Sequence, residues 1–131
     1  MTNTNLKLVE TTIEALGKGD IKTALDNFSD DIYFAFKGDT PLSCDTTGKT
    51  EFIDFLKSVG KYISKPINFK VTRIIEAGDT IVSESTGNSA NRSGEPYCNE
   101  YCHIWKVRDG KICEFIEYCD THLVMNRLIN Q

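Results

Sequence analysis

Apolar residues recur every three or four positions in three segments of the chain, and this spacing predicts three amphipathic helices. The first lies near the N-terminus and ends at a pair of glycines; its apolar positions are Leu6, Val9, Ile13 and Leu16. The second is short and follows Asp20, a residue type that caps helix N-termini. The third begins at Thr47 or Gly48 and ends before Pro66, with an apolar side formed by Phe52, Ile53, Phe55, Leu56, Val59 and Ile63.

Runs of β-branched and aromatic residues, bounded by turn residues, predict five strands. They occupy residues 32–36, 67–76, 80–88, 97–108 and 112–120. The polar segments 38–48 and 89–95 are predicted loops, and residues 121–129 a short terminal helix or tail. Because the helices mostly precede a consecutive run of strands, the chain is predicted to be a single α+β domain over residues 1–131. Helices would then cover one face of a curved antiparallel sheet.

The last two strands are predicted to form a long hairpin around Asp109 and Gly110. This dipeptide suits a type I′ turn, which needs positive φ at both central residues. A two-residue turn pairs Arg108 with Lys111, and alternation then divides the hairpin into two faces. One face carries Asn99, Tyr101, His103, Trp105, Glu114, Ile116, Tyr118 and Asp120. The other carries Cys98, Glu100, Cys102, Ile104, Lys106, Cys113, Phe115, Glu117 and Cys119.

Composition narrows the classes of partner. The 131 residues carry a formal net charge of −4 and no basic run, which argues against nucleic acid. No apolar run approaches the ~20 residues that span a bilayer, and the N-terminal residues lack a signal-peptide core. We therefore expect no membrane association and a cytoplasmic location. The five cysteines form no Cys-x-x-Cys motif and are interpreted as reduced structural thiols; neither a metal nor a cofactor is expected.

Three stretches of the chain resemble the NTF2-like superfamily, in particular its SnoaL-like and ketosteroid-isomerase-like branch. They are Ala15-Leu16-Gly17-Lys18-Gly19-Asp20 through Phe28-Ser29-Asp30-Asp31, then Gly48-Lys49, and Asp109-Gly110-Lys111-Ile112 through Glu117-Tyr118-Cys119-Asp120. The resemblance covers nearly the whole chain. It implies a cone, with helices packed on the concave face of a strongly bent antiparallel sheet. It implies no single activity, because this fold hosts isomerases, cyclases, epoxide hydrolases and binding modules.

Few catalytic residues of the family carry over to this chain. At the tyrosine, base and donor-acid positions of ketosteroid isomerases, this sequence has Thr12, Phe36 and, depending on one gap, His103. The Arg-x-Asp positions of limonene-epoxide hydrolases fall on Ser85 and Gly87, although the aspartate that closes the last strand matches Asp120. SnoaL-type polyketide cyclases resemble this chain in using a carboxylate and a histidine, roles that Asp120 and His103 could fill.

Asp120 and His103 are accordingly the candidate catalytic residues. A carboxylate inside an apolar cone could abstract a proton next to a carbonyl, and a neutral imidazole could donate to the developing oxyanion. Two alternatives stay open: Asp120 could cap the terminal helix, and His103 could be a hydrogen-bonded core residue. The expected ligand-binding residues are Tyr101, Tyr118, Asn99, Trp105, Phe36 and Ile116, of which the tyrosines could equally be packing partners.

Two functions are compatible with this interpretation. The first is a cofactor-free isomerase or cyclase, or a related lyase or hydrolase, that acts on a small apolar carbonyl compound. The second is a non-catalytic module of the same fold that binds a hydrophobic ligand or mediates association. In either case we expect a homodimer through the outer hairpin face. No helix is left to cover Ile104, Phe115 and the cysteines predicted there.

Overall fold

The computed structural model describes residues 4–131. Its helices are α1 (Thr4–Lys18), α2 (Ile21–Asp26), α3 (Lys49–Gly60) and α4 (Thr121–Leu123), and a π-helix, η1 (Val124–Ile129), continues α4. Its strands are β1 (Phe28–Phe36), β2 (Cys44–Thr47), β3 (Asn68–Ala77), β4 (Thr80–Ala90), β5 (Pro96–Tyr97), β6 (Glu100–Arg108) and β7 (Lys111–Cys119). Within this range no helix is long and apolar enough to cross a membrane.

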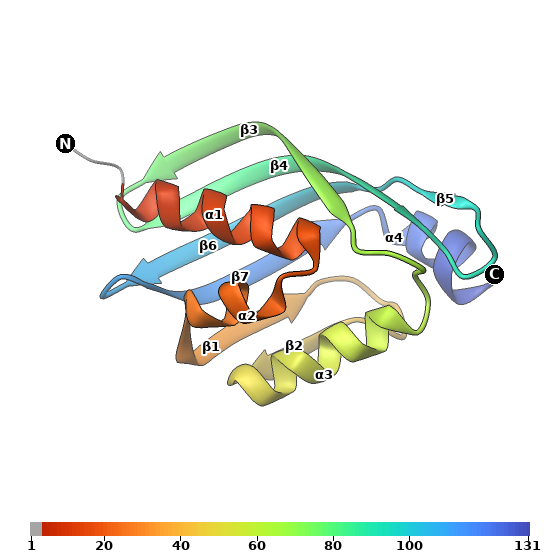
Figure 1. Cartoon of the computed structure of the whole chain (residues 1–131), viewed down its shortest axis with the longest axis horizontal. Helices are drawn as coiled ribbons and strands as arrows, with labels where there is room; N and C mark the ends of the chain where they lie inside the picture. Colours follow the sequence, from red (N-terminus) through yellow and green to blue (C-terminus); the bar gives the residue numbers. More distant parts are fainter. Residues whose placement is uncertain (1–3) are drawn as a thin grey trace.

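The strands form one curved sheet in the order β2-β1-β7-β6-β4-β3, and the short β5 pairs with β4. Helices α1, α2 and α3 lie on one face of this sheet, and α4 with η1 lies near β5 at one end (Figure 1). The predicted α+β fold is therefore confirmed. One pairing differs from the expected antiparallel sheet, since β1 and β7 are parallel. Parallel neighbours need a long crossover, which the chain from β2 to β6 supplies.

Most elements lie close to their predicted bounds. The third helix ends at Gly60, earlier than predicted, and Ile63 instead forms a β-bridge with Asn91. The other differences occur where a partner strand extends an element. The predicted loop 38–48 contains β2, which pairs with β1. β1 itself begins at Phe28 instead of residue 32, and β4 continues to Ala90 because its end pairs with β5. Such extensions depend on hydrogen bonds to another strand, so local residue preferences do not reveal them.

Aromatic side chains fill much of the space between the helices and the sheet. Phe34 of β1 meets Phe52 of α3 edge to face, with ring centroids 4.9 Å apart. Trp105 of β6 stacks on Phe115 of β7 at 4.0 Å, and its indole nitrogen donates to Ser83 Oγ at 3.0 Å. All four aromatic side chains are buried. Each such pair contributes about 0.5–1.5 kcal/mol beyond its area burial. The Phe34–Phe52 pair holds α3 against the sheet, and the Trp105–Phe115 pair joins β6 to β7.

The β6–β7 hairpin has the predicted turn but not the predicted register. Asp109 and Gly110 both have positive φ, 52° and 74°, as a type I′ turn requires. Arg108 faces Lys111, again as predicted. Beyond the next pair, however, one residue of β7 has no partner on β6, which is a β-bulge.

The unpaired residue of the bulge is Cys113. Val107 faces Ile112, but Lys106 then faces Glu114. The backbone N–H of Ile112 donates to Asn27 and that of Val107 donates to Asp79, both outside the hairpin. Distant segments of the chain therefore satisfy both N–H groups of the residue pair on the turn side of the bulge.

The bulge moves every later residue of β7 to the face opposite the predicted one. His103 faces Glu117, whereas the predicted register placed Ile116 there. Because side chains alternate with a period of two, one extra residue reverses all the faces beyond it. The inward side chains of β7 are Phe115, Glu117 and Cys119, and the outward ones are Glu114, Ile116 and Tyr118.

Candidate functional site

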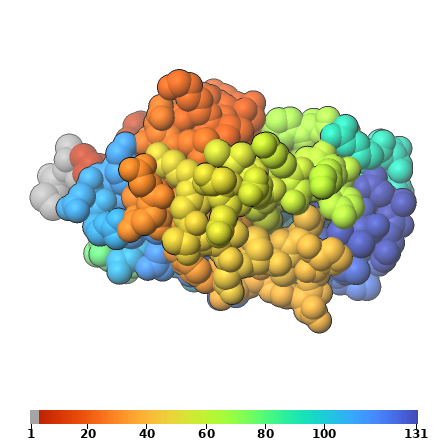
Figure 2. All heavy atoms as spheres, turned by 90° about the horizontal axis from the view of Figure 1, so that it is seen from below, coloured from red at the N-terminus to blue at the C-terminus, as the bar shows by residue number. Residues whose placement is uncertain are grey.

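A pocket of about 560 Å³ lies between the sheet and the helices. Its walls come from α1, α2, α3, β1, β6 and β7, while Val124 and Leu128 of η1 line one part of it. Much of the wall is apolar and includes Phe34, Phe36 and Phe55. Figure 2 shows this side of the molecule, where α3 and the α3–β3 connection meet the C-terminal segment. A pocket of this volume is in the range of sites for small molecules.

Glu117 is the one carboxylate among the pocket-lining residues of the described range 4–131. It points inward because of the bulge and lies directly across from His103 of β6. Its Oε1 is 2.8 Å from His103 Nε2, and the two side chains are 13% and 2% exposed respectively. The other oxygen, Oε2, has no hydrogen-bond partner among these residues, so it is free to meet a ligand.

The imidazole of His103 is enclosed by aromatic rings. Tyr101 lies nearly parallel to it at 5.4 Å, and the other three surrounding rings are those of Phe69, Trp105 and Phe115. Nδ1 is buried and has no partner within residues 4–131. A proton there would be a buried unsatisfied donor, at a cost of ~1–3 kcal/mol. Nε2 therefore carries the hydrogen that is donated to Glu117 Oε1.

A pair of tyrosines provides the second polar feature of the pocket. Tyr97 and Tyr101 both line it, with their hydroxyl oxygens 3.3 Å apart. Asn99 Nδ2 also donates to the Tyr97 hydroxyl, at 2.9 Å. The two hydroxyls share one hydrogen bond, so one phenolic hydrogen has no acceptor in the described part of the chain. This pair can therefore donate one hydrogen bond to a ligand.

Burial keeps both of these phenols protonated. It raises the pKa of Tyr97 to about 12, against the opposing effect of the hydrogen bonds with Tyr101 and Asn99. Burial likewise raises the pKa of Tyr101 well above its usual value, and the nearby Tyr97 and Glu117 add to the increase. Near neutral pH both groups are therefore hydrogen-bond donors.

Gly87 on β4 provides the room that the Tyr101 ring occupies. A β-carbon at this position would lie 2.6 Å from Tyr101 Cε2 and 2.7 Å from Ile67 Cγ2. Gly87 is also the position at which the epoxide-hydrolase pattern has its aspartate. No side chain fits there while Tyr101 keeps its place, since such close contacts are repulsive.

Five of the predicted site residues lie on the inner side of the sheet. Phe36 and Tyr101 line the pocket, and His103 lies beside Glu117. Trp105 and Asn99 are buried but are not part of the pocket wall. Asn99 Oδ1 accepts from two backbone N–H groups, so this amide fixes the end of the hairpin.

The other three predicted site residues lie outside the pocket. Ile116 and Tyr118 are on the outer face because of the bulge, and Tyr118 is 44% exposed. Asp120 is exposed and caps α4: its Oδ1 accepts from the backbone N–H groups of His122 and Leu123, at 3.0 and 3.3 Å. The predicted arrangement of these residues around one internal space is thus wrong, and the capping alternative for Asp120 is confirmed.

Sequence reasoning missed Glu117 and Tyr97. The predicted register places Glu117 on the outer face. Its position between Ile116 and Tyr118 is the signal for it, because a shift of one residue would turn this carboxylate inward. Tyr97 precedes Asn99 by two residues, so the alternation of side chains along the predicted strand places it on the same face as Asn99 and Tyr101. Among residues 4–131, no group of three or more His, Cys, Asp or Glu side chains is arranged to hold a metal ion.

Comparisons with known proteins agree with this architecture. A sequence model of the SnoaL-like domain matches residues 9–115. No curated protein matches the chain significantly. An NTF2-like protein of unknown function from Burkholderia pseudomallei is 21% identical and has a TM-score of 0.89 over 97% of this chain and 98% of its own.

Two further solved structures have described ligands or activities. TerC, co-crystallised with polyporic acid, is 21% identical, with a TM-score of 0.88 over 98% of this chain and all of its own (100%). An LEH-like epoxide hydrolase from Mycobacterium tuberculosis is 20% identical, with a TM-score of 0.77 over 98% and 92% of the two chains. At this level of identity the similarity establishes the NTF2-like cone and leaves the activity open.

Removing the cap of α4 should affect stability and leave the pocket unchanged. We expect Asp120→Ala to lower the free energy of unfolding in urea by ~1 kcal/mol, because two N–H groups lose their acceptor. Asp120→Asn is the control, since asparagine caps equally well. Equal destabilisation by both substitutions would contradict the capping role.

Raising the pH should destabilise the fold through Tyr97. The pKa of this group is about 12 in the folded protein and near 10 when unfolded, so the unfolded state ionises first. Its contribution is complete below pH 10 and is lost as the pH rises through 12. Urea unfolding across this range should show a smaller loss of stability in Tyr97→Phe than in the native chain. An equal loss in both proteins would argue against burial of this phenol.

Proposed function

This chain belongs to the SnoaL-like domain family of the NTF2-like superfamily, and on that premise we propose that it binds a small apolar carbonyl compound and transfers a proton on it. Glu117 is the base, His103 positions it, and the tyrosine pair donates to the carbonyl oxygen. The observation that carries this proposal is a single carboxylate in a largely apolar pocket, bonded at 2.8 Å to a buried imidazole.

Proton abstraction next to a carbonyl needs a base and a donor for the enolate oxygen. Glu117 Oε2 takes the proton, and the electron pair of the C–H bond forms the enolate, whose charge lies on oxygen. Tyr101 donates its phenolic hydrogen to Tyr97, so the free phenolic hydrogen of Tyr97 donates to that oxygen. Return of the proton to a different carbon completes an isomerisation. Alternatively, the enolate carbon attacks a second carbonyl of the same ligand, and the new alkoxide takes the proton, which completes a cyclisation.

The catalytic residues of this mechanism differ from those that the sequence predicts. Glu117 takes the role of Asp120, because Asp120 is an exposed cap and Glu117 lies in the pocket. Thr12 stands at the isomerase tyrosine position, but its hydroxyl donates to Leu8 O and accepts from Asn27. Epoxide hydrolysis is not proposed, because Ser85 and Gly87 stand at the Arg-x-Asp positions of that network and Asp120 is an exposed cap.

A non-catalytic binding module is the second candidate. The apolar wall of the pocket favours it, because such a wall holds a hydrophobic ligand without any chemistry. The two candidates make the same prediction for ligand binding and opposite predictions for proton exchange. Exchange is therefore the measurement that separates them.

Proton exchange on 2-tetralone, a bicyclic ketone with acidic protons next to its carbonyl, tests the base. We expect the native protein to accelerate deuterium uptake in heavy water, measured by proton NMR. Glu117→Gln should reduce the acceleration by ~10²–10⁴-fold, the usual range for general base catalysis. Tyr97→Phe and Tyr101→Phe should each reduce the acceleration less than Glu117→Gln does, because the tyrosine that remains can still donate a hydrogen bond to the carbonyl oxygen.

Glu114→Gln is the matched control for this experiment. Glu114 lies three residues away on the same strand and faces outward, so its replacement should leave exchange unchanged. Native-like exchange by Glu117→Gln would refute its role as base. Binding of 2-tetralone without accelerated exchange would favour the binding module.

We also propose that two copies associate through the outer face of the sheet. Four apolar side chains form a continuous cross-strand row there: Ile75, Val82, Ile104 and Ile116. Phe115, which was expected on this face, points inward and is 3% exposed because of the bulge. The row is flanked by the Arg73–Glu84 ion pair on one side and by Lys106 and Glu114 on the other. A twofold-related copy would meet both signs of charge beside an apolar strip.

Sedimentation equilibrium tests this association. We expect a dimer at micromolar concentration with ~800 Å² buried per partner, and a monomer for Ile104→Lys, whose charge would be buried at the centre of the row. Val71→Lys is the control, because Val71 is exposed on β3 opposite Ser85, outside the row. A native monomer at these concentrations would refute the proposal.

The cytoplasm is the proposed location. All five cysteines, which lie within the described residues, are free thiols. Cytosolic reductants keep such thiols reduced, whereas secreted proteins commonly pair them. The free thiols therefore support this location.

A further inference from the structure

Three basic residues from separate segments meet at the pocket. Lys57 lies on α3, Lys65 in the connection from α3 to β3, and Arg92 in the connection from β4 to β5. All three line the pocket and are exposed, so they stand where the pocket meets solvent, which we call its mouth. The whole chain has a net charge of −4, so this local excess of positive charge is not a consequence of composition.

None of these three cations forms an ion pair with a residue in the described range. Five other lysine and arginine side chains do form ion pairs, namely Lys18, Lys22, Lys49, Arg73 and Arg108, and within residues 4–131 the remaining lysines and arginines outside the pocket do not. The one acidic residue of the pocket, Glu117, is 13% exposed and bonded to His103. The positive charge at the mouth is therefore uncompensated by acidic side chains of the pocket.

Arg92 is held in position at this mouth. Its Nη2 donates to the carbonyl oxygen of Gly60, the last residue of α3, and its backbone N–H donates to Tyr62 and to the side chain of Gln131. A guanidinium has five N–H donors, so most remain available after this contact. A fixed arginine also loses less conformational entropy when it binds an anion. A structural role at the end of α3 uses one N–H donor of Arg92. It does not involve Lys57 or Lys65.

We propose that the mouth of the pocket is an anion subsite formed by Lys57, Lys65 and Arg92, and that the ligand is an acidic aromatic or polycyclic compound. This deepens the proposed function and rests on it. The carboxylate, or an equally acidic enol or sulfonate, binds the three cations, and the apolar body lies against Phe34, Phe36 and Phe55. Repulsion between Glu117 and the acidic group keeps that group at the mouth, so the ligand enters in one orientation.

A matched pair of fluorescent probes tests the subsite. 1-Anilinonaphthalene-8-sulfonate and N-phenyl-1-naphthylamine share one ring system, and only the first carries an anionic group. Fluorescence titration of the native chain should show binding of both. Lys57→Gln/Lys65→Gln/Arg92→Gln should weaken the sulfonate about tenfold, as expected for loss of three nearby charges, and the neutral probe less than about twofold. Salt should weaken only the sulfonate.

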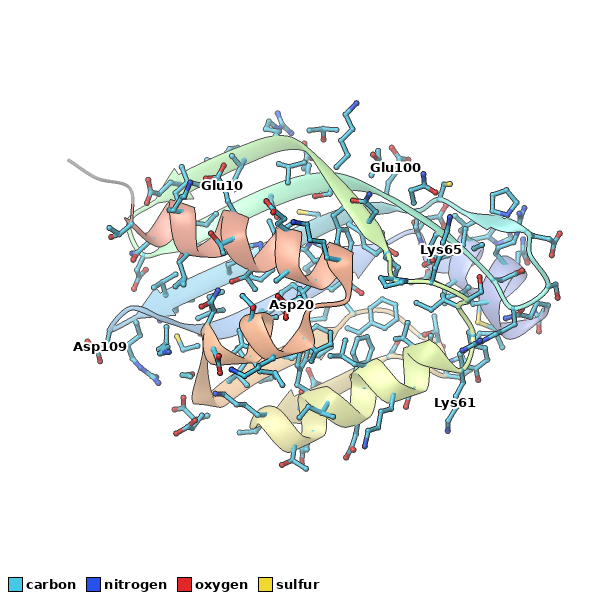
Figure 3. All side chains as sticks on the ribbon, in the orientation of Figure 1. Glu10, Asp20, Lys61, Lys65, Glu100 and Asp109 are labelled. Atoms are coloured by element: carbon cyan, nitrogen blue, oxygen red, sulfur yellow. The ribbon has the colours of Figure 1, made fainter. Side chains whose placement is uncertain are left out.

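Lys61→Gln is the control for a general loss of positive charge. Lys61 lies between two of these residues in the sequence, is not part of the pocket wall, and extends away from the sheet in Figure 3, while Lys65 lies on the connection toward β3. Lys61→Gln should leave the affinities for the sulfonate and for the neutral probe unchanged. Lys57→Gln/Lys65→Gln keeps the Arg92 contact with α3 and should still weaken the sulfonate about threefold, which guards against misfolding of the triple variant.

The outcomes separate the two proposals. If both probes bind and neither loses affinity in the variants, the anion subsite is refuted while the apolar pocket stands. If both lose affinity equally, the effect is structural and the subsite is again refuted. If the native chain binds neither probe, the proposed function fails and the subsite fails with it.

Discussion

One unpaired residue, Cys113, decides what the pocket contains. With this bulge, Glu117 faces His103 and Phe115 completes the aromatic core. Without it, Ile116 would face the imidazole, and both ring nitrogens of a buried histidine would be left without partners, at ~1–3 kcal/mol for each group. The bulge therefore both creates a polar site and gives Nε2 of His103 its hydrogen-bond partner. Bulges commonly re-aim side chains next to functional sites in this way.

The polar groups of the pocket are held by neighbours that leave one side of each group free. His103 occupies one oxygen of Glu117, and Asn99 and Tyr101 occupy the lone pairs of the Tyr97 hydroxyl. What remains is one carboxylate oxygen on β7 and the phenolic hydrogen of Tyr97 on β5. Groups fixed in this way need little reorganisation when charge develops on a ligand, which is the basis of electrostatic catalysis.

The cone is shared with proteins that are only about one-fifth identical in sequence, among them one of unknown function and one crystallised with polyporic acid. The family architecture supplies a curved sheet, a helical cover and an apolar space, but no fixed chemistry. Here the isomerase tyrosine position holds Thr12 with its hydroxyl already bonded, and Gly87 makes room for the Tyr101 ring. The polar groups of this pocket thus come from β5, β6 and β7, and its basic residues from α3 and two connections.

The sequence by itself determined the helices, most strands and the Asp109–Gly110 turn, because these depend on local periodicity and turn chemistry. Its motifs also resemble the superfamily to which the chain belongs. The sequence identified the capping of α4 by Asp120 as one of two alternatives. Only the tertiary structure decided the face of Glu117, Ile116 and Tyr118. Asn27 and Asp79 accept hydrogen bonds from Ile112 and Val107, the pair on the turn side of the bulge. Contacts with such distant segments leave no periodic trace in the hairpin sequence.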